Sequence, residues 1–180
     1  MHGVMAANTG AQAKLNQTVQ LIGEALHSEV CSIYLLREGV LELYATRGLN
    51  QSAVHVTKLA MGEGLVGTIA THIEMLNLAE AAAHPDYAYR PETGEEQFHS
   101  FAGVPIVRRE RAVGVLCVQH AASRGYDEIE IEALQTVALV LSELIANANL
   151  VDEHSSTGTN LDQSAQTFQG LKLVDGMAKG

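Results

Sequence analysis

The segment from residue 127 to residue 154 carries the pattern that most constrains the fold. Apolar side chains recur there at alternating intervals of three and four residues, at Leu134, Val137, Leu141, Leu144, Ala148 and Val151. This spacing places all six on one stripe of a helix. Asp127 and Glu130 form a capping-box pattern in front of it. We therefore predict a long helix with one apolar face packed on the rest of the domain.

A second apolar line runs along the same helix through Ile131, Ala138 and Ile145. Packing on a sheet needs only one stripe, so the second line predicts contact with another helix, from the same chain or from a partner. A helix that is buried over a wide face would show the same pattern. Homodimerisation, packing on a parent protein and burial within the chain all remain open.

The first half of the chain alternates helical and strand patterns. Residues 11–28 place Leu15, Val19, Ile22 and Leu26 at helical spacing. Residues 30–47 read as a β-hairpin that turns at Glu38-Gly39, and residues 53–64 as a third strand that runs into a glycine-rich break.

A short helix is predicted to open at Gly64, followed by a short strand from Met75. Residues 101–121 read as a second hairpin, in which Val113 to Gln119 is apolar enough for a central strand. This order predicts an α+β fold with a central antiparallel sheet. The N- and C-terminal helices should cover one face. Short helices and a loop should cover a pocket on the other face.

Composition excludes several classes of function. The chain has 11 Lys and Arg against 21 Asp and Glu, a net charge of −10, and its most basic run is the "RRER" of residues 108–111, which we place on a hairpin turn. This balance argues against nucleic-acid and membrane binding. Cys31 and Cys117 lie in apolar strand patterns and are predicted to be reduced core residues, as expected of a cytoplasmic protein.

No motif in the chain supports catalysis or metal binding. The eight histidines and two cysteines lack metal-ligand spacing, and no Ser is placed with a base in a recognisable triad order. Gly62, Gly64 and Gly67 match no phosphate-binding motif and are better explained by turn geometry. We predict no catalytic residue, no metal site and no cofactor in this chain.

The stretch "HPDYAYRPETGEEQFHSF", residues 84–101, is the strongest candidate for a binding loop. Arg90 can meet a carboxylate, the nearby glutamates can meet an ammonium group, and Tyr87, Tyr89 and Phe98 can cover both. An amino acid carries both charges. The alternative is a solvated acidic loop in which Arg90 pairs with a nearby Glu.

Strand alternation adds side chains from the sheet to this candidate site. Tyr34 shares a face with Ser32 and Leu36, and Gln119 shares one with Val115 and Cys117. Gln119 suits the mouth of a pocket, although it would also suit the surface end of a strand. The predicted ligand-binding set is Tyr34, Arg90, Glu92, Thr93, Glu95, Glu96, Phe98, Ser100, Cys117 and Gln119.

Four stretches carry a resemblance to a known family: "GEGLVGTIA", "MLNLAEAA", "GVPIVRRERAVGVLCVQ" and "EIEALQTVALVLSE". Together with the order of elements, they resemble a GAF domain over about residues 13–153. The cyclic-nucleotide "NKFDE" pattern and the tetrapyrrole-binding pattern of that family are missing, and Cys31, the nearest candidate for bilin attachment, lies within a strand. Haem ligation by His99 or His120 stays open, with packing as the alternative.

The stretch "HPDYAYRPETGEEQFHSFAGVPI" is more narrowly similar to the GAF domain of nitrogen-related phosphoenolpyruvate–protein phosphotransferases. The resemblance implies a sensor of a nitrogen metabolite, with glutamine the leading candidate, that adjusts autophosphorylation of a magnesium-dependent parent enzyme serving a phosphocarrier protein. It implies no enzyme activity for this chain itself. The alternative is a structural dimerisation module with a vestigial pocket.

The resemblance and the composition together divide the chain into four parts. Residues 1–12 are an N-terminal extension or cloning remnant, and residues 13–153 form the sensor domain. Residues 154–170 are polar and read as a linker. Residues 171–180, "LKLVDGMAKG", resemble the start of the following phosphotransferase domain.

Overall fold

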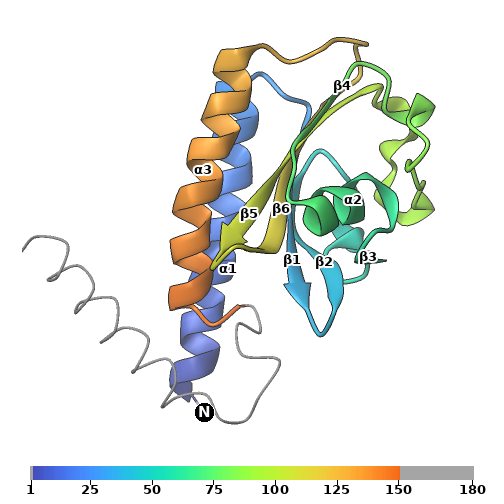
Figure 1. The fold of residues 1–180 in the computed structure, drawn as a ribbon. Coiled ribbons are helices and arrows are strands. Elements are labelled where there is room, and N and C mark those ends of the chain that lie inside the picture. Colours follow the sequence, from blue (N-terminus) through green and yellow to red (C-terminus); the bar gives the residue numbers. More distant parts are fainter. Residues whose placement is uncertain (1, 151–180) are drawn as a thin grey trace, which may run out of the picture.

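The computed structural model describes residues 2–150, with side chains from Thr9 onward. The chain forms an α+β fold around one six-stranded antiparallel sheet of order β3-β2-β1-β6-β5-β4, as predicted (Figure 1). The elements are α1 (His2–Ala25), β1 (Val30–Arg37), β2 (Val40–Arg47), β3 (Lys58–Ala60), α2 (Gly64–His72), β4 (Leu76–Leu78), β5 (Ser100–Arg108), β6 (Arg111–His120) and α3 (Glu128–Asn147). α1 crosses the predicted boundary at residue 13, and the predicted linker and following domain lie outside the described residues.

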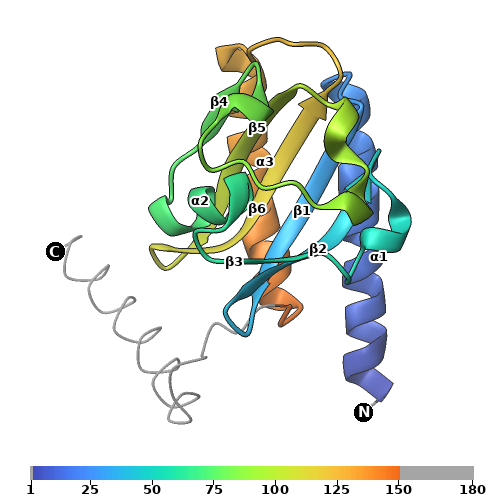
Figure 2. The same cartoon turned by 90° about the vertical axis from the view of Figure 1, so that its right-hand side faces the viewer.

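The two long helices lie on one face of the sheet, while α2 and the loop between β4 and β5 lie on the other (Figures 1 and 2). The core under the helices joins Leu15 of α1 and Leu134 and Leu141 of α3 to Ile33 and Leu116 of the central strands. A separate apolar cluster fills the α2 face. The four long strands β1, β2, β5 and β6 therefore bury alternate side chains in two different layers, which matches the predicted alternation.

Both apolar lines of α3 pack into the core over the described residues, and Val151 of the first line lies outside them. Leu134 and Leu141 of the first line are fully covered, and Ile131, Ala138 and Ile145 of the second line belong to the same core. The second line therefore needs no partner chain, and our inference of another helix from it is satisfied by α1 and the sheet. The apolar side chains that α3 does expose are Ile129, Leu139 and Val140.

Both hairpins turn where predicted, through two-residue connections with left-handed backbone. φ is +51° at Glu38 and +80° at Gly39, and +53° at Arg109 and +64° at Glu110. Positive φ at both positions gives the turn whose twist matches that of the flanking strands. The capping box of α3 is also confirmed, because Asp127 accepts the N–H of Glu130 and the Glu130 side chain accepts the N–H of Asp127.

The third strand is shorter than predicted. Residues 51–53 form a 3-10 turn and only Lys58–Ala60 pair with β2. The chain forms a bulge between these segments, because His55 has a φ of +65° and both its N–H and the carbonyl oxygen of Thr57 bond to the same residue of β2, Leu43. The alternating Val54 and Val56 that suggested a strand lie on this bulge.

The glycine-rich break is a tight entry to α2. Gly62 and Gly64 have φ values of +81° and +69°, as turn geometry requires. Gly67 differs from our prediction, since it lies inside α2 and its role is close packing. A Cβ atom at Gly67 would lie 2.6 Å from the carbonyl oxygen of Ala60.

We predict that Leu134→Ala lowers the free energy of unfolding by about 2–5 kcal/mol, because it opens a cavity under α3. Leu139→Ala is the matched control. Leu139 lies on the same helix with 71% of its surface exposed, so the same substitution should change stability by less than about 1 kcal/mol. Urea denaturation of both variants measures the difference, and equal losses would contradict the described packing of α3.

Candidate functional site

A small pocket lies between the sheet and the loop that connects β4 to β5. Figure 2 shows this loop crossing the face of the sheet opposite α1 and α3. Its walls come from β1, β3, α2, the β4–β5 loop, β5 and β6, and its lining residues are Tyr34, Leu59, Gly64, Leu65, Val66, Tyr87, Ala88, Arg90, Glu95, Phe101 and Gln119. Four of the predicted ligand-binding residues, Tyr34, Arg90, Glu95 and Gln119, meet in it. The free volume is about 20 Å³, roughly enough for one water molecule. A metabolite can enter only if the loop moves.

The loop is held over the sheet by buried polar contacts around Thr93. The Thr93 hydroxyl donates to the carbonyl oxygen of Arg90 at 2.7 Å and accepts the N–H of Glu95 at 3.3 Å. The Glu92 carboxylate accepts the Thr57 hydroxyl at 3.1 Å, and the Glu92 carbonyl accepts the Asn50 side chain at 3.1 Å. Glu92 and Thr93 thus shape the loop and do not line the pocket.

Glu95 is the acidic group of the pocket. The backbone N–H of Arg90 and the side chain of Gln119 lie close enough to favour its charged form. Burial nevertheless raises its pKa from 4.5 to about 7, an effect that outweighs these two groups, and Glu92 and Glu96 add to the rise. Gln119, only 3% exposed, therefore lies in the pocket and not at a surface strand end.

Arg90 forms an ion pair with Glu63, the residue before α2. This matches the alternative prediction, in which Arg90 pairs with a glutamate, although the partner comes from outside the loop. The Nε atom of Arg90 is buried and finds no acceptor among the described residues. Arg90 thus retains one unused donor at the pocket wall.

The first turn of α2 forms the opposite wall. Gly64, Leu65 and Val66 line the pocket there, and the N–H groups of a first helical turn have no partners inside the helix. The helix dipole adds partial positive charge at this end. The pocket therefore holds anion-favouring groups on one wall and the Glu95 carboxyl on another.

The remaining predicted residues lie elsewhere. Glu96 is exposed and accepts the Tyr89 hydroxyl at 2.9 Å. Phe98 is half-buried but does not line the pocket. Cys117 does not line the pocket either and is buried in the apolar cluster on the α2 face of the sheet.

Ser100 is on the helix side of the sheet, because strand alternation puts its neighbour Phe101 on the pocket side. Its hydroxyl lies 3.1 Å from that of Tyr126 and accepts the His120 N–H. His120 in turn bonds to Tyr126 and to the carbonyl oxygen of His27. His120 is thus a hydrogen-bonded core residue, while His99 is exposed and lies beside Glu80.

Sequence reasoning missed Glu63 and the apolar lining residues Leu59, Leu65, Val66 and Phe101. The sequence did contain a signal for Phe101, since strand alternation puts Phe101 on the same face as Gly103, which is the pocket face. Glu63 carried none, because its contact with Arg90 spans 27 residues.

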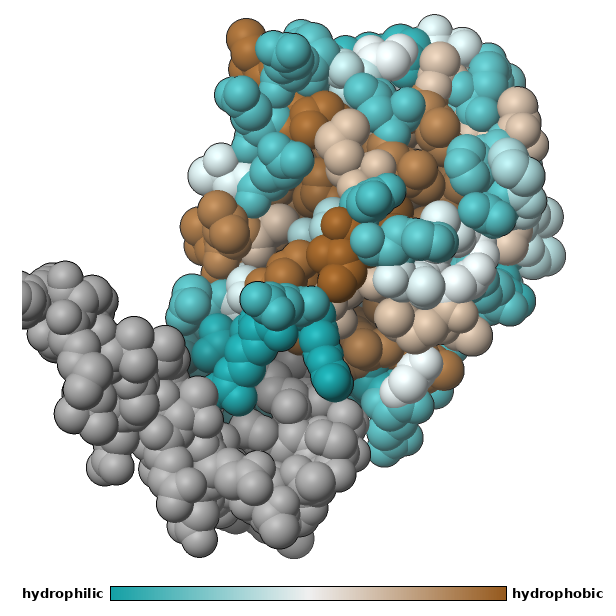
Figure 3. Space-filling model, in the orientation of Figure 1, coloured by the Kyte–Doolittle hydropathy of each residue, from teal (hydrophilic) through white to brown (hydrophobic). Residues whose placement is uncertain are grey.

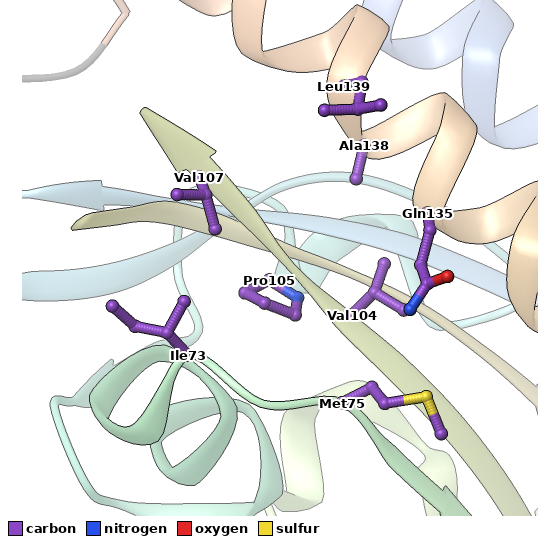
Figure 4. A pocket seen from close by; sticks show the side chains of 8 residues that line it. All are labelled: Ile73, Met75, Val104, Pro105, Val107, Gln135, Ala138 and Leu139. Carbon is purple, nitrogen blue, oxygen red and sulfur yellow. The ribbon is translucent and has the colours of Figure 1, made fainter. Parts of the chain in front are cut away.

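A second hollow, which we call the edge groove, lies between α3 and the turn that follows α2 (Figure 4). Its volume is about 270 Å³ and its lining residues are Ile73, Met75, Val104, Pro105, Val107, Gln135, Ala138 and Leu139. Apolar atoms gather across the middle of this side of the molecule (Figure 3). The edge groove has no ionisable lining residue, so it lacks the groups that recognise a charged metabolite.

Cys31 and Cys117 are free and buried, as predicted. Burial raises the pKa of the Cys31 thiol to about 12 and that of Cys117 well above its usual value, which makes both poor nucleophiles. Within residues 2–150, no cluster of His, Cys, Asp or Glu side chains is arranged to hold a metal ion. None of the helices in this part of the chain combines the length and apolar character that crossing a membrane requires.

The sequence and the fold match a known class of domain. The GAF domain family model matches residues 11–145, and the chain belongs to the GAF domain family. Over 138 residues it is 40% identical to a protein of Escherichia coli K12 described as "Phosphoenolpyruvate-dependent phosphotransferase system". That match covers 76% of this chain and 18% of the relative, so the chain corresponds to a minor part of the relative's length.

Two solved structures support the same placement. The GAF domain of a phosphoenolpyruvate-protein phosphotransferase from Coxiella burnetii is 34% identical, with a TM-score of 0.74, and the match covers 82% of this chain and 92% of that one. The corresponding domain from Acinetobacter is 33% identical, with a TM-score of 0.70 and coverages of 78% and 84%. The chain is thus similar to GAF domains of phosphoenolpyruvate–protein phosphotransferases, which confirms the predicted resemblance.

We predict that Glu95→Gln stabilises the protein at pH 8 and leaves its stability nearly unchanged at pH 5. Because the folded state raises the pKa of Glu95 from 4.5 to about 7, folding favours the protonated carboxyl. The stability that this group provides is complete below pH 4.5 and is lost as the pH rises through 7. Glutamine keeps the site neutral throughout.

Thermal unfolding followed by circular dichroism from pH 5 to pH 8 measures this effect. The difference in Tm between Glu95→Gln and the parent should grow with pH. Glu96→Gln is the matched control, because Glu96 is exposed and its pKa is lowered. A Tm difference for Glu95→Gln that stays constant over this range would show that Glu95 is ionised in the fold.

Proposed function

We propose that this chain is a regulatory sensor domain that binds an amine-bearing nitrogen metabolite in the pocket beneath residues 84–101, with glutamine the leading candidate. The observation that carries the proposal is the Glu95 carboxyl. It lines the pocket together with the buried Gln119, and no Lys or Arg side chain bonds to it among the described residues. A carboxylate in such surroundings favours a ligand that supplies the missing positive charge.

An amino acid fits the distribution of polar groups around the pocket. Glu95 would accept hydrogen bonds from the ammonium group. The first turn of α2 and the unused Nε of Arg90 would donate to the carboxylate. Gln119 offers an amide that can pair with a side-chain amide of the ligand, while Tyr34 and Phe101 supply apolar contact.

Binding requires the loop to act as a lid. The free volume of about 20 Å³ is far below the several hundred Å³ that small-molecule pockets usually enclose. The Arg90–Glu63 ion pair joins the loop to α2 across the pocket mouth, and it is exposed enough that breaking it costs little. We expect ligand entry to break this pair and to move residues 84–98.

The biological setting follows from the relatives. We propose that the domain belongs to a cytoplasmic phosphoenolpyruvate–protein phosphotransferase of the nitrogen phosphotransferase system and adjusts its autophosphorylation. The parent would phosphorylate itself with the help of magnesium and pass the phosphate to a phosphocarrier protein. In this proposal the chain itself performs no catalysis. The support is the 34% identity to the Coxiella burnetii domain over most of both chains.

The signal would leave the domain through α3, which packs on the sheet and leads toward residues 151–180. A ligand changes the output only if it binds two arrangements of the domain with different affinities. The pocket residue Gln119 and the buried His120 are neighbours on β6, and His120 bonds to Tyr126, next to the N-cap of α3. Gln119, His120 and Tyr126 would thus connect the pocket beneath the lid to the start of α3.

We predict that calorimetric titration of the 180-residue chain with L-glutamine gives saturable heat. Glu95→Gln should weaken binding by about tenfold or more, because a charge-assisted hydrogen bond becomes a neutral one. Glu96→Gln, one residue away but exposed, should bind like the parent. Hydrogen exchange should show protection of residues 84–101 on binding.

Absence of both heat and protection would contradict the proposal for glutamine. Equal weakening by Glu95→Gln and Glu96→Gln would contradict the assignment of the ammonium site. A panel of other amino acids under the same conditions then identifies the ligand if glutamine does not bind.

A second candidate function is homodimerisation through the terminal helices. It is favoured by the exposed apolar side chains of α3, since Leu139 is 71% and Val140 66% exposed, and such side chains on adjacent positions are typical of interfaces. We predict that, if this function is correct, sedimentation velocity gives a dimer that Val140→Glu converts to a folded monomer. A chain that is monomeric at all concentrations would exclude it.

A further inference from the structure

We propose that Glu95 selects ligands that carry a positively charged group and exchanges its own proton for that group on binding. The inference rests on the proposed function, in that it concerns the same pocket, and it adds a ligand class and a dependence on pH. Its basis is the arrangement of charges that face Glu95.

No cation among the described residues neutralises the Glu95 carboxylate directly. The groups that favour its charged form are the Arg90 backbone N–H and the Gln119 amide, both uncharged, while the Arg90 guanidinium is paired with Glu63. The ionisable groups that influence Glu95 or are influenced by it are Glu92 and Glu96 of the loop, Tyr87 and Tyr89 of the loop, Tyr34 of β1 and Cys117 of β6. All six are neutral or negative.

These surroundings favour the neutral carboxyl in the empty pocket. Burial in the small cavity is the main cause that raises the pKa of Glu95 to about 7. The carboxyl is therefore about half protonated at pH 7 and about nine-tenths protonated at pH 6. In this state it can still donate or accept a hydrogen bond, but it carries little attraction for a cation.

An incoming ammonium group replaces the proton. The carboxylic acid O–H bond breaks, its proton goes to the solvent, and the carboxylate then accepts hydrogen bonds from the ligand N–H groups. The ligand keeps its charge, so one proton leaves for each carboxyl that was protonated. A ligand without the ammonium group has nothing to offer the ionised carboxylate and leaves the proton in place.

The exchange predicts a distinct response to pH. If the carboxylate in the complex stays ionised, the apparent Kd should rise about tenfold between pH 8 and pH 6, because only the ionised fraction binds the cation. Proton release should be about 0.5 per ligand at pH 7 and about 0.9 at pH 6. A sensor that receives the ammonium group through backbone carbonyls or an ordinary surface carboxylate would show neither this rise in Kd nor this proton release.

Calorimetry of the 180-residue chain with L-glutamine in two buffers of different ionisation enthalpy measures the proton release. The parent and Glu96→Gln should release about 0.5 proton at pH 7. Glu95→Gln should bind more weakly and release none. Glutaramate, which is glutamine without its amino group, should bind the parent weakly and release none. Glutamine binding without proton release from the parent would overturn the exchange and leave the proposed function intact.

Carbon-13 NMR titration of the glutamate carboxyls in the ligand-free chain provides a readout that does not depend on glutamine. One resonance, absent from Glu95→Gln, should titrate near pH 7, and its midpoint should fall when ethylammonium is added. A midpoint near 4.5, or one that ethylammonium does not move, would overturn the inference. If glutamine gives no heat, the proposed function fails for glutamine, and this titration alone decides on the role of Glu95.

Discussion

The pairing of β1 with β6 joins the two halves of the chain, and both layers of the domain depend on it. Residues 30–35 pair with residues 114–119, so each of the two hairpins meets the other across a separation of about eighty positions in sequence. Alternate side chains of these strands enter different cores. Ile33 and Leu116 contact the long helices, while Tyr34, Val115 and Cys117 belong to the cluster under α2. A shift of one residue in this register would exchange the two faces and place Gln119 under the helices.

The local parts of this fold could be predicted because their causes are local. The helical spacing through Leu134 and Leu141, the Asp127 cap and the Glu38-Gly39 turn each involve residues within a few positions of one another. The prediction became wrong where a local pattern competed with a distant contact. Residues 53–57 alternate like a strand, yet the His55 N–H and the Thr57 carbonyl oxygen both bond to Leu43 of β2, so these residues form a bulge.

The candidate site could be predicted only in part, for the same reason. Alternation grouped Tyr34 with Ser32 and Leu36, and Gln119 with Val115 and Cys117. The loop composition pointed to Arg90 and Glu95, and Tyr34, Gln119, Arg90 and Glu95 all line the pocket. Composition could not separate Glu95 from Glu96, because the difference between them is burial. Nor could it place Ser100, whose hydroxyl belongs to the His120–Tyr126 cluster on the opposite face.

The tight folding of the loop buries the Glu95 carboxyl, and this burial opposes the stability of the fold. The contacts of Thr93 with Arg90 and Glu95 fold the loop tightly, and that folding carries Glu95 inward against Gln119. A loop built for stability alone would place an apolar residue there, since burial of the carboxyl favours its neutral form and opposes its charge. The Arg90–Glu63 pair lies at the mouth and does not compensate Glu95. The domain thus keeps an acidic group at a position where it does not stabilise the fold. A cationic ligand would favour the ionised carboxyl there and would bind through it.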